Sequence, residues 1–471
     1  MFTGRTRELE KMEKLYQGDR FECIILYGRR RVGKTTLINE FIKDKPACYY
    51  MAVEGTGREN LAGLSRAVLN RTHGVTAAGG AEFAGFEELL RYVDEIAQSG
   101  ERWILAIDEF PYLAASYFAI SSLLQRHIDQ CWKDSRLYLI LCGSSMSFME
   151  EQVLGYKSPL YGRRTAQFKL HPFTFFEAAP MLHSFSLEEQ AVLYGVTGGI
   201  PEYLSRIQTG MDLDDIITGL FFEESGRLFE EPSNLLKQEL REPASYHSIL
   251  TAVAGGASRM NEIAAKTGLE TSGCSSQLAS LIALEIVKKE RPATESETSR
   301  RTLYRLADSM FLFWYRFVRP NISGISAGAG ERIYQMLVKP QLSDFMGSVF
   351  ETICMQYLFL PQVYEKLPFP IGNAGRWWGN NPAKHCQEKI DIMAVQGQSA
   401  LFCECKWHQT PVGADALEIL MERGQMFRYE SRYFIVFSKN GFKKEALQYR
   451  ESQPHLALIS FDEMVRNGSL T

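Results

Sequence analysis

Residues 28–35 read Gly-Arg-Arg-Arg-Val-Gly-Lys-Thr, and this stretch decides the fold of the first part of the chain. It follows the apolar run Cys23–Tyr27 and precedes a helical pattern with Leu37, Ile38 and Phe41 directed inward. The spacing satisfies G-x-x-x-x-G-K-[ST], in which glycines let successive backbone N–H groups point at phosphate oxygens. The following helix adds its positive N-terminal end. Strand, loop and helix therefore come in the order that a phosphate-binding loop requires.

The polar residues of this loop predict its ligands. Lys34 supplies a cation to the terminal phosphates, and the Thr35 hydroxyl is a ligand for magnesium. We therefore predict that the chain binds the cofactors ATP and Mg²⁺. The predicted nucleotide-binding residues of the loop are Gly28, Arg29, Arg30, Arg31, Val32, Gly33, Lys34, Thr35 and Thr36.

A second apolar run, Trp103–Ile107, ends in the two carboxylates Asp108 and Glu109. Ligands of parallel sheets bind at the C-terminal ends of the strands, which is where this pair is expected. Asp108 is predicted to hold magnesium, directly or through water, and Glu109 to polarise the attacking water as the catalytic base. The alternative is that both residues simply cap a strand end.

Short apolar runs alternate with helical patterns from residue 1 to about 205, which is typical of an α/β domain with a mostly parallel sheet covered by helices. The runs show little polar alternation, as expected for strands buried on both faces. We predict a P-loop ATPase domain over 1–205 and helices over 206–239 that close it as a lid. The four predicted strands are Cys23–Tyr27, Cys48–Val53, Trp103–Ile107 and Leu137–Cys142.

Two further sites follow strands but have weaker motifs. Ser144 comes directly after the run Leu137–Cys142, where its hydroxyl either meets the terminal phosphate or belongs to an ordinary turn. Arg163 and Arg164 lie in a polar turn. They are either an arginine finger for the nucleotide of a neighbouring subunit or a solvated basic turn. The residues alone leave both choices open.

Composition limits the class of protein. A chain of 471 residues is too long for one core, so two to four domains are expected. The net charge of −4 means that any contact with DNA must be local. The nine cysteines form no C-x-x-C pair and are expected to be reduced. We find no apolar run long enough to cross a bilayer, so we expect a cytoplasmic protein without membrane contact.

The order of these motifs resembles the archaeal-type ATPase family, which belongs to the AAA+/STAND group of nucleoside triphosphatases. The resemblance implies that Gly4 and Arg5 line the adenine side of the nucleotide, and that Gly199 and Pro201 touch the base or the sugar. The matching blocks span residues 1 to about 205 and are Phe2–Arg5 with Glu8 and Leu9, Gly28–Thr35, Ala106–Glu109, Cys142–Ser145, Leu160–Thr165 and Gly198–Pro201.

The same resemblance bears on the two open choices. It implies that Ser144 is the phosphate sensor and that Arg163 or Arg164 is the arginine finger.

Residues 240–322 are predicted to form a winged helix-turn-helix, followed by a linker at the Gly/Ser-rich stretch Ser323–Gly330. The third helix is the candidate for contact with DNA, and a protein-docking or spacer role is the alternative. The expected elements are helices at Tyr246–Val253, Met260–Lys266 and Ser275–Leu284 and strands at Ile286–Lys289 and Thr302–Leu306.

The last predicted domain, 331–471, has acidic residues in two apolar runs that we expect to be adjacent strands. Asp391 lies in the first run, and Glu404 shares one face of the second with Lys406. Two acidic groups and a lysine can hold magnesium and orient a water, as hydrolysis of a phosphodiester requires. A structural cluster of salt bridges is the alternative.

This arrangement resembles the restriction-endonuclease-like PD-(D/E)-x-K fold, which is also α/β. The resemblance implies that Asp391 and Glu404 are metal ligands, that Lys406 is the water-orienting base or charge stabiliser, and that Glu351 is an auxiliary acid. Lys389 departs from the pattern, because related sequences often have Glu at this position.

Two functions follow from these predictions. The first is an ATP-hydrolysing switch that controls a magnesium-dependent nuclease acting on DNA. The second is an ATP-gated protein-binding or signalling scaffold whose C-terminal domain is catalytically silent. Both are ATPases. Contact with DNA through the winged helix and the C-terminal domain, and assembly into a homo-oligomer, are left open.

Overall fold

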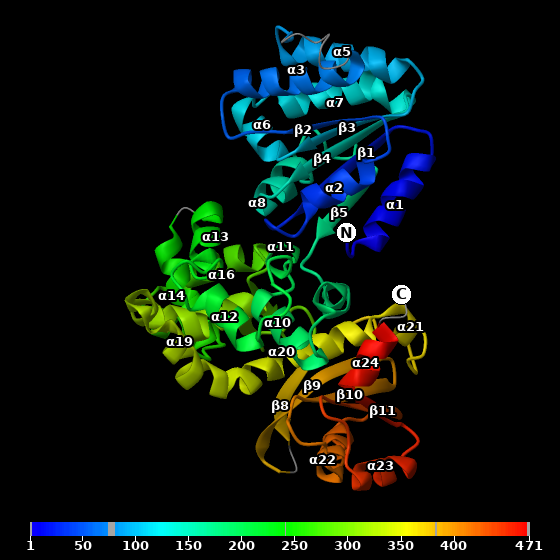
Figure 1. The fold of residues 1–471 in the computed structure, drawn as a ribbon. Coiled ribbons are helices and arrows are strands. Elements are labelled where there is room, and N and C mark those ends of the chain that lie inside the picture. The colour runs from blue at the N-terminus through cyan, green and yellow to red at the C-terminus, as the bar shows by residue number, and fades with distance from the viewer. Residues whose placement is uncertain (1, 74–80, 241, 382–383, 469–471) are drawn as a thin grey trace. The chain divides into compact units, whose positions relative to one another are not determined.

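The computed structural model describes residues 2–73, 81–240, 242–381 and 384–468. The chain forms two compact units (Figure 1). The first comprises Met1–Phe173 and Ile200–Glu202, and the second comprises Thr174–Gly199 and Tyr203–Thr471.

The first unit is built on a parallel five-stranded sheet in the order β2-β3-β4-β1-β5. Every residue of β1, β3 and β4 is buried, because helices cover both faces of the sheet. The predicted parallel α/β fold is therefore confirmed for this unit. Its strands are β1 Glu22–Gly28, β2 Ala47–Met51, β3 Trp103–Asp108, β4 Leu137–Gly143 and β5 Ala166–Leu170.

The helices of the first unit form two layers. In Figure 1, α3, α5 and α7 cover one face of the sheet, and α1 and α2 cover the other. Alternate side chains of β1, such as Cys23 and Ile25, pack with Leu64 of α3 and Leu89 of α5 in the main core. The bounds are α1 Thr6–Gln17, α2 Lys34–Ile42, α3 Gly57–His73, α5 Phe86–Gln98, α6 Phe110–Ser116, α7 Ile120–Gln130 and α8 Met146–Phe148.

The second unit begins earlier than the boundary expected at residue 205. A capping box between Thr174 and Glu177 starts α9, and the Phe175 N–H donates to Gln356 of α20. Gln356 also donates to the hydroxyl of Tyr194 on α10. These long-range contacts tie α9 and α10 to α20, and the helices of the predicted lid also belong to the second unit. The bounds are α9 Phe175–Ala178, α10 Leu187–Thr197, α11 Pro201–Leu204, α12 Leu213–Phe221, α13 Glu231–Glu239 and α20 Leu342–Leu358.

Three helices and an antiparallel hairpin follow, in the order that the sequence predicts. Gly268 has φ +70° where α15 ends, a conformation that glycine adopts without strain. The bounds are α14 Pro243–Ala254, α15 Met260–Thr267, α16 Thr271–Ala283, β6 Val287–Glu290 and β7 Leu303–Leu306.

The predicted linker at Ser323–Gly330 is wrong, because this stretch consists of two helical segments that meet at a kink, where Gly328 has φ +82°. A Cβ atom on Gly330 would collide with the carbonyl oxygen of Phe222, so glycine here permits close packing of two segments. The region consists of α17 Ser309–Phe313, α18 Ile322–Gly324 and α19 Gly330–Ile333, with π-helical turns at Trp314–Val318, Ile325–Ala329 and Tyr334–Val338 and 3₁₀ turns at Arg319–Asn321 and Lys339–Gln341.

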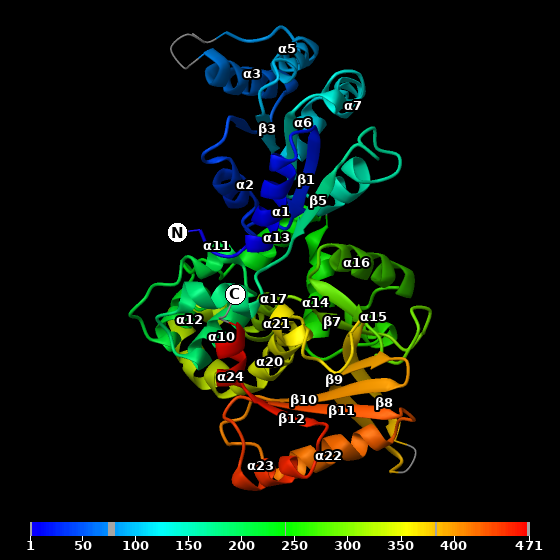
Figure 2. The same cartoon turned by 90° about the vertical axis from the view of Figure 1, so that its right-hand side faces the viewer.

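The chain ends in a mixed five-stranded sheet in the order β12-β11-β10-β9-β8. The two predicted adjacent strands are β9 and β10, which pair antiparallel, whereas β10, β11 and β12 are parallel. Figures 1 and 2 show α20 and α24 on one face and α22 and α23 on the other. The bounds are α21 Pro361–Tyr364, β8 Ala374–Asn381, β9 Cys386–Gln396, β10 Ser399–Lys406, α22 Ala414–Gln425, β11 Ser431–Ser438, α23 Lys444–Glu451, β12 Leu456–Ser460 and α24 Phe461–Gly468.

All nine cysteines are free thiols, and six of them are buried. In the part of the chain that the structure describes, no helix is both long and apolar enough to span a bilayer.

Candidate nucleotide site and C-terminal carboxylate cluster

The phosphate-binding loop joins β1 to α2 through backbone angles that favour glycine. Gly28 has φ +155° and Gly33 has φ +91°. A side chain at Gly28 would collide with the carbonyl oxygen of Leu170 on β5, its neighbour in the sheet. The loop therefore needs glycine at position 28 for space and at position 33 for its conformation.

Lys34 is buried inside the loop. Its ammonium group donates to the carbonyl oxygens of Gly28 and Arg29 at 2.9 and 2.8 Å. Burial lowers the pKa of Lys34, and the nearby Glu109 and Asp108 carboxylates act in the opposite direction. The loop thus folds around its own cation, at the place where phosphate oxygens are expected.

The fully buried Asp108 gathers three donors at the end of β3. Its Oδ2 accepts hydrogen bonds from Thr35 Oγ1 at 2.6 Å and from the Tyr49 hydroxyl at 2.9 Å, while Oδ1 accepts from the Glu109 N–H at 2.9 Å. A hydroxyl beside a carboxylate supplies the hard oxygen atoms that magnesium prefers, so Thr35 and Asp108 fit this ion.

Tyr49 is a member of this site that the sequence patterns did not reveal. It lies on β2, beside β3 in the sheet, so its place at Asp108 depends on strand order. Burial raises the pKa of the Tyr49 phenol, and the Asp108 carboxylate raises it further. The phenol therefore remains protonated and acts as a hydrogen-bond donor at neutral pH.

Glu109 is held by the predicted sensor. Its Oε2 accepts from the Ser144 hydroxyl at 2.8 Å and from the Ser144 N–H at 3.2 Å. Glu109 also has φ +49°, which is uncommon for a residue with a side chain. The structure thus brings Lys34, Thr35, Asp108, Glu109 and Ser144 to one end of the sheet.

The N-terminal segment is tied to the loop through Arg5. This buried residue donates to the carbonyl oxygens of Val32 and His171 at 2.9 and 2.5 Å, and its guanidinium lies 4.7 Å from the centre of the Phe173 ring. Gly4 has φ +73°, and a Cβ atom there would lie 2.8 Å from Phe173. The structure thus places Gly4 and Arg5 beside the loop, and their contact with adenine remains a prediction.

The other predicted nucleotide contacts are spread more widely. Arg30 donates to the Tyr112 hydroxyl at 2.9 Å, and Arg31 has φ +68°. Gly199 and Pro201 fall in different units, and their contact with the base or sugar also remains a prediction. Arg29 is buried, Val32 is fully buried, and Thr36 belongs to the first turn of α2.

The two candidate finger arginines differ in their own contacts. Arg163 donates two hydrogen bonds to Asp129 of α7, at 2.9 and 2.6 Å, and two more to the carbonyl oxygens of Pro159 and Tyr161. Arg164 donates to the Leu154 carbonyl at 3.5 Å. Arg163 is therefore held within its own unit, and Arg164 is the less constrained of the two.

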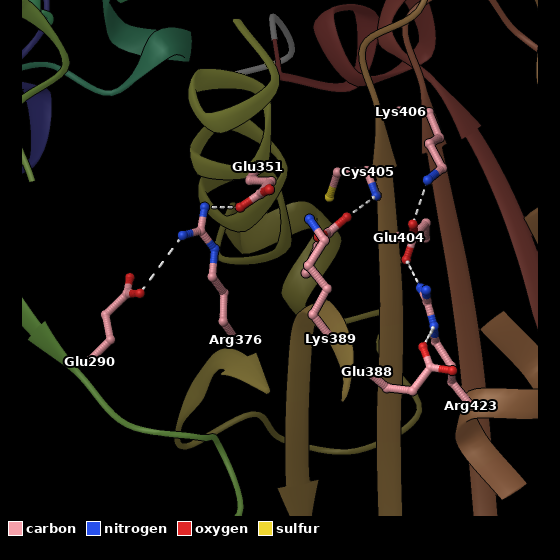
Figure 3. Close-up of polar contacts among 10 residues, drawn as sticks. Glu290, Glu351, Arg376, Glu388, Lys389, Glu404, Cys405, Lys406 and Arg423 are labelled. Carbon is pink, nitrogen blue, oxygen red and sulfur yellow. Dashed lines mark hydrogen bonds and ion pairs between the residues drawn. The ribbon is translucent and has the colours of Figure 1, made fainter. Parts of the chain in front are cut away.

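In the second unit, Glu404 lies in a network of ion pairs (Figure 3). Its Oε1 accepts from Lys406 at 2.5 Å and its Oε2 from Arg423 at 3.1 Å. Arg423 also donates to Glu388 at 2.8 Å. Glu404 and Lys406 line a pocket of about 340 Å³ between β10 and α22.

Asp391 lies on β9, next to the last residue that pairs with β10. The last backbone pair joins Ile392 to Cys403, and the Asp391 Oδ2 then accepts from the Cys405 N–H at 3.0 Å. The pairing with β8 shifts register at this point, so β9 contains a bulge. The side chain of Asp391 thus satisfies a backbone donor and does not line the pocket of Glu404.

The predicted auxiliary acid Glu351 is also paired. Arg376 of β8 donates to Glu351 and lies 3.7 Å from Glu290 of β6, as Figure 3 shows. Within the described ranges, no group of three or more His, Cys, Asp or Glu side chains has the arrangement of a metal site. Asp391, Glu404 and Glu351 are therefore neighbours in the fold with separate partners.

A parallel sheet with this loop after β1 and an acidic pair after β3 defines the first unit as a P-loop nucleoside triphosphatase domain. The model of an ATPase domain predominantly from Archaea matches residues 2–207, and a model of archaeal and bacterial proteins of unknown function matches residues 314–418. An uncharacterised protein of Methanocaldococcus jannaschii is 33% identical over 410 residues, which are 86% of this chain and 88% of the relative. The chain therefore belongs to this family of archaeal-type ATPases, which bind and hydrolyse ATP.

Two further proteins are similar. An uncharacterised ATP-binding protein of the same organism is 51% identical over 45 residues, which are 10% of this chain and 76% of that protein. A Walker-type ATPase of Pyrococcus abyssi has a TM-score of 0.48 and 19% identity, covering 67% of this chain and 96% of that one.

Proposed function

We propose that the chain is a magnesium-dependent ATP hydrolase that works as a switch of the AAA+/STAND type. The observation that carries this proposal is the meeting of Lys34, Thr35, Asp108, Glu109 and Ser144 at one end of the sheet. Magnesium, when bound, neutralises charge on the phosphate oxygens, and Thr35 and Asp108 are the residues that would hold it.

The residues divide the work by chemistry. Lys34 exchanges the carbonyl oxygens of its own loop for phosphate oxygens, so the ammonium keeps its hydrogen bonds when nucleotide binds. Glu109 accepts a proton from water, and its basicity rises when Ser144 turns away, because the hydrogen bonds to Oε2 stabilise the carboxylate. Ser144 therefore links the state of the nucleotide to the freedom of the base, which is the property that a switch needs.

The test separates binding from turnover. Lys34→Ala is expected to abolish ATP binding, whereas Glu109→Gln is expected to keep binding and to slow hydrolysis by at least about 100-fold. Binding is measured by calorimetry and hydrolysis by phosphate release. Glu87→Gln, at an exposed site on α5, is the matched control and is expected to leave turnover unchanged. Normal hydrolysis by Glu109→Gln would overturn the assigned base.

A second candidate function is magnesium-dependent hydrolysis of a phosphodiester in DNA by the C-terminal sheet. It is favoured by the pocket that Glu404 shares with Lys406, because a carboxylate and a lysine side by side suit phosphate chemistry. Arg423 already neutralises Glu404, so cleavage requires this contact to open. The three-helix domain, as a winged helix, would hold the DNA.

Nicking of supercoiled plasmid with Mg²⁺ or Mn²⁺, with and without ATP, tests the second candidate. Lys406→Ala and Glu404→Gln are expected to stop nicking, because both residues line this pocket. If neither the unmodified chain nor a variant cuts, or all cut equally, the nuclease idea is abandoned. The C-terminal sheet is then the silent part of an ATP-gated protein-binding or signalling scaffold.

A further inference from the structure

A groove in the second unit lies between the hairpin β6–β7 and the edge strand β8. Its volume is about 820 Å³, and its walls come from the N-terminal ends of α15 and α16, the start of β7 and the β8–β9 hairpin. We call it the hairpin groove. The lining residues that matter most are Arg259, Arg300, Arg301, Trp378, Asn380 and Gln387.

The charge of the groove is positive. Three arginines line it, and none of its described lining residues is acidic. Arg301 pairs with Glu295 at 2.8 Å, and Arg259 lies 4.0 Å from Glu262. Arg300 is exposed and makes no ion pair with any described residue. At least one guanidinium is therefore available for an anion.

The third helix of the domain has a different surface. The exposed side chains of α16 are small and uncharged, as at Ser272, Ser275, Ser276 and Ala279. The electrostatic part of affinity for nucleic acid comes from cations that neutralise phosphates, and this face provides none. Three arginines of the domain are instead at the groove, which Thr271 at the N-terminal end of α16 also lines.

The groove also offers contacts that suit unpaired bases. Trp378 is half-buried and is one of the residues that line the groove, and indole rings stack on bases of any kind. The exposed amides of Asn380 and Gln387 are joined by a hydrogen bond across β8 and β9. The volume is that of a site for a drug-sized ligand, which is enough for a short stretch of one strand.

Three hydrogen bonds fix the walls of the groove. The Ala293 N–H donates to the Arg376 carbonyl at 2.9 Å, the Trp377 indole donates to Thr294 at 3.2 Å, and Arg301 donates to the Trp378 carbonyl at 2.7 Å. The segment between β6 and β7, residues 291–302, which we call the hairpin segment, is therefore hydrogen-bonded to β8. A site whose walls are already ordered loses little entropy when it binds.

We propose that the hairpin groove binds single-stranded nucleic acid, with Arg259 and Arg300 on the phosphates and Trp378 stacked on a base. This proposal requires neither ATP turnover nor cleavage. It can therefore be tested independently of the functions proposed above.

The test measures fluorescence anisotropy of labelled oligo-dT, oligo-U and a duplex of equal length, with the full chain and no nucleotide. Single strands are expected to bind more tightly than the duplex. Arg300→Ala is expected to weaken binding and to lower the slope of log Kd against log salt by about 0.7. Trp378→Ala is expected to weaken binding about tenfold without changing that slope.

Conservative variants and a matched control separate this result from misfolding. Arg300→Lys and Trp378→Phe are expected to restore most of the affinity, and Lys289→Ala removes an exposed cation of β6 outside the groove without effect. Tighter binding of either DNA or RNA identifies the sugar and supports the site. Absence of binding, equal binding of the duplex, or unchanged affinity in Arg300→Ala and Trp378→Ala would overturn it.

Discussion

Tyr49 shares an oxygen of Asp108 with Thr35, which makes it part of the nucleotide site. A ligand that takes the place of the Thr35 hydrogen bond leaves the Tyr49 bond intact. The phenol can therefore hold the carboxylate in one orientation while the other contacts change.

Tyr49→Phe tests this role, because it removes only the hydroxyl. A hydrogen bond to a charged group contributes about 1.5–3 kcal/mol, so we expect kcat/KM for ATP to fall by about tenfold or more. The loss is expected to be largest at low magnesium concentration. Steady-state hydrolysis measured across a magnesium titration checks the prediction.

Tyr50→Phe is the control, since it makes the same change one residue further along β2. The Tyr50 hydroxyl donates to Asn60 of α3 at 2.7 Å, on the other side of the sheet. This variant is expected to alter stability and not the magnesium dependence. Identical magnesium titrations for the two variants would contradict a role for Tyr49 in the site.

For single residues, the sequence predicts a role in the site where the position of the side chain depends on nearby residues in the chain. Lys34 and Thr35 follow from the loop motif, and Asp108 and Glu109 from the end of an apolar run. Tyr49 could not be predicted in the same way, because its contact depends on which strand lies beside β3.

At the scale of elements, α14 is joined to the π-helical turn Trp314–Val318 through His247. The ring Nδ1 lies 2.6 Å from the Tyr315 hydroxyl and 3.4 Å from the guanidinium of Arg319. Burial, helped by the charges of Arg319 and Lys237, lowers the pKa of His247 to about 4. The imidazole is therefore neutral in the folded protein at pH 6.

This contact gives stability a pH dependence with a definite sign. Below pH 6.5 the unfolded chain binds a proton at His247 that the folded chain does not bind until about pH 4. The free energy of unfolding is therefore expected to fall as the pH is lowered through this window. His247→Gln is expected to reduce the slope of the unfolding free energy against pH, by an amount that corresponds to the uptake of up to one proton. Urea unfolding at several pH values measures this slope.

Carboxylates also titrate in this window, so the difference between proteins is what matters. His183→Gln changes an exposed imidazole of the same unit and is expected to follow the unmodified protein. An equal slope for His247→Gln and the unmodified protein would contradict the prediction.

Elements were predictable where burial is uniform. The three central strands β1, β3 and β4 were found because both of their faces are covered. The edge strands β2 and β5 have partly exposed residues, and of these two only β2 was predicted. For the stretch Ser323–Gly330, the sequence predicted a linker where the structure has helical segments. Its glycines indicate a loop by composition, but Gly330 is required by the approach of Phe222, which is distant in sequence.

At the scale of the whole molecule, the contacts of Arg163 and Arg164 bear on assembly. Arg163 is engaged by Asp129 within one chain, so Arg164 is the better candidate for a finger that acts on a neighbouring subunit. Arg164→Ala is expected to keep ATP binding and to lower turnover by about 1000-fold. Turnover per chain of the unmodified protein is expected to rise with protein concentration, as phosphate release over a dilution series would show.

Asp129→Asn is the control for this prediction. It weakens the ion pair of Arg163 and leaves Arg164 in place, so turnover is expected to persist. A flat specific activity, together with normal turnover in Arg164→Ala, would instead indicate a monomer that hydrolyses ATP without a finger.

The boundary between the two units is also a property of the whole molecule. It was the hardest feature to predict from the sequence. The helices α9 and α10 follow the first sheet in sequence but pack on α20, more than 150 residues later. Amphipathic patterns show that a helix has a buried face and do not show which partner covers it.

The hydrogen bonds between the hairpin segment and β8 have a consequence for solubility. An edge strand presents unpaired N–H and C=O groups that can pair with another copy of the chain. Ala293 and Arg301 occupy two of the carbonyl oxygens of β8, those of Arg376 and Trp378. A chain with this segment shortened would bare the edge and would be prone to strand-to-strand aggregation, so the segment also protects the protein from its own copies.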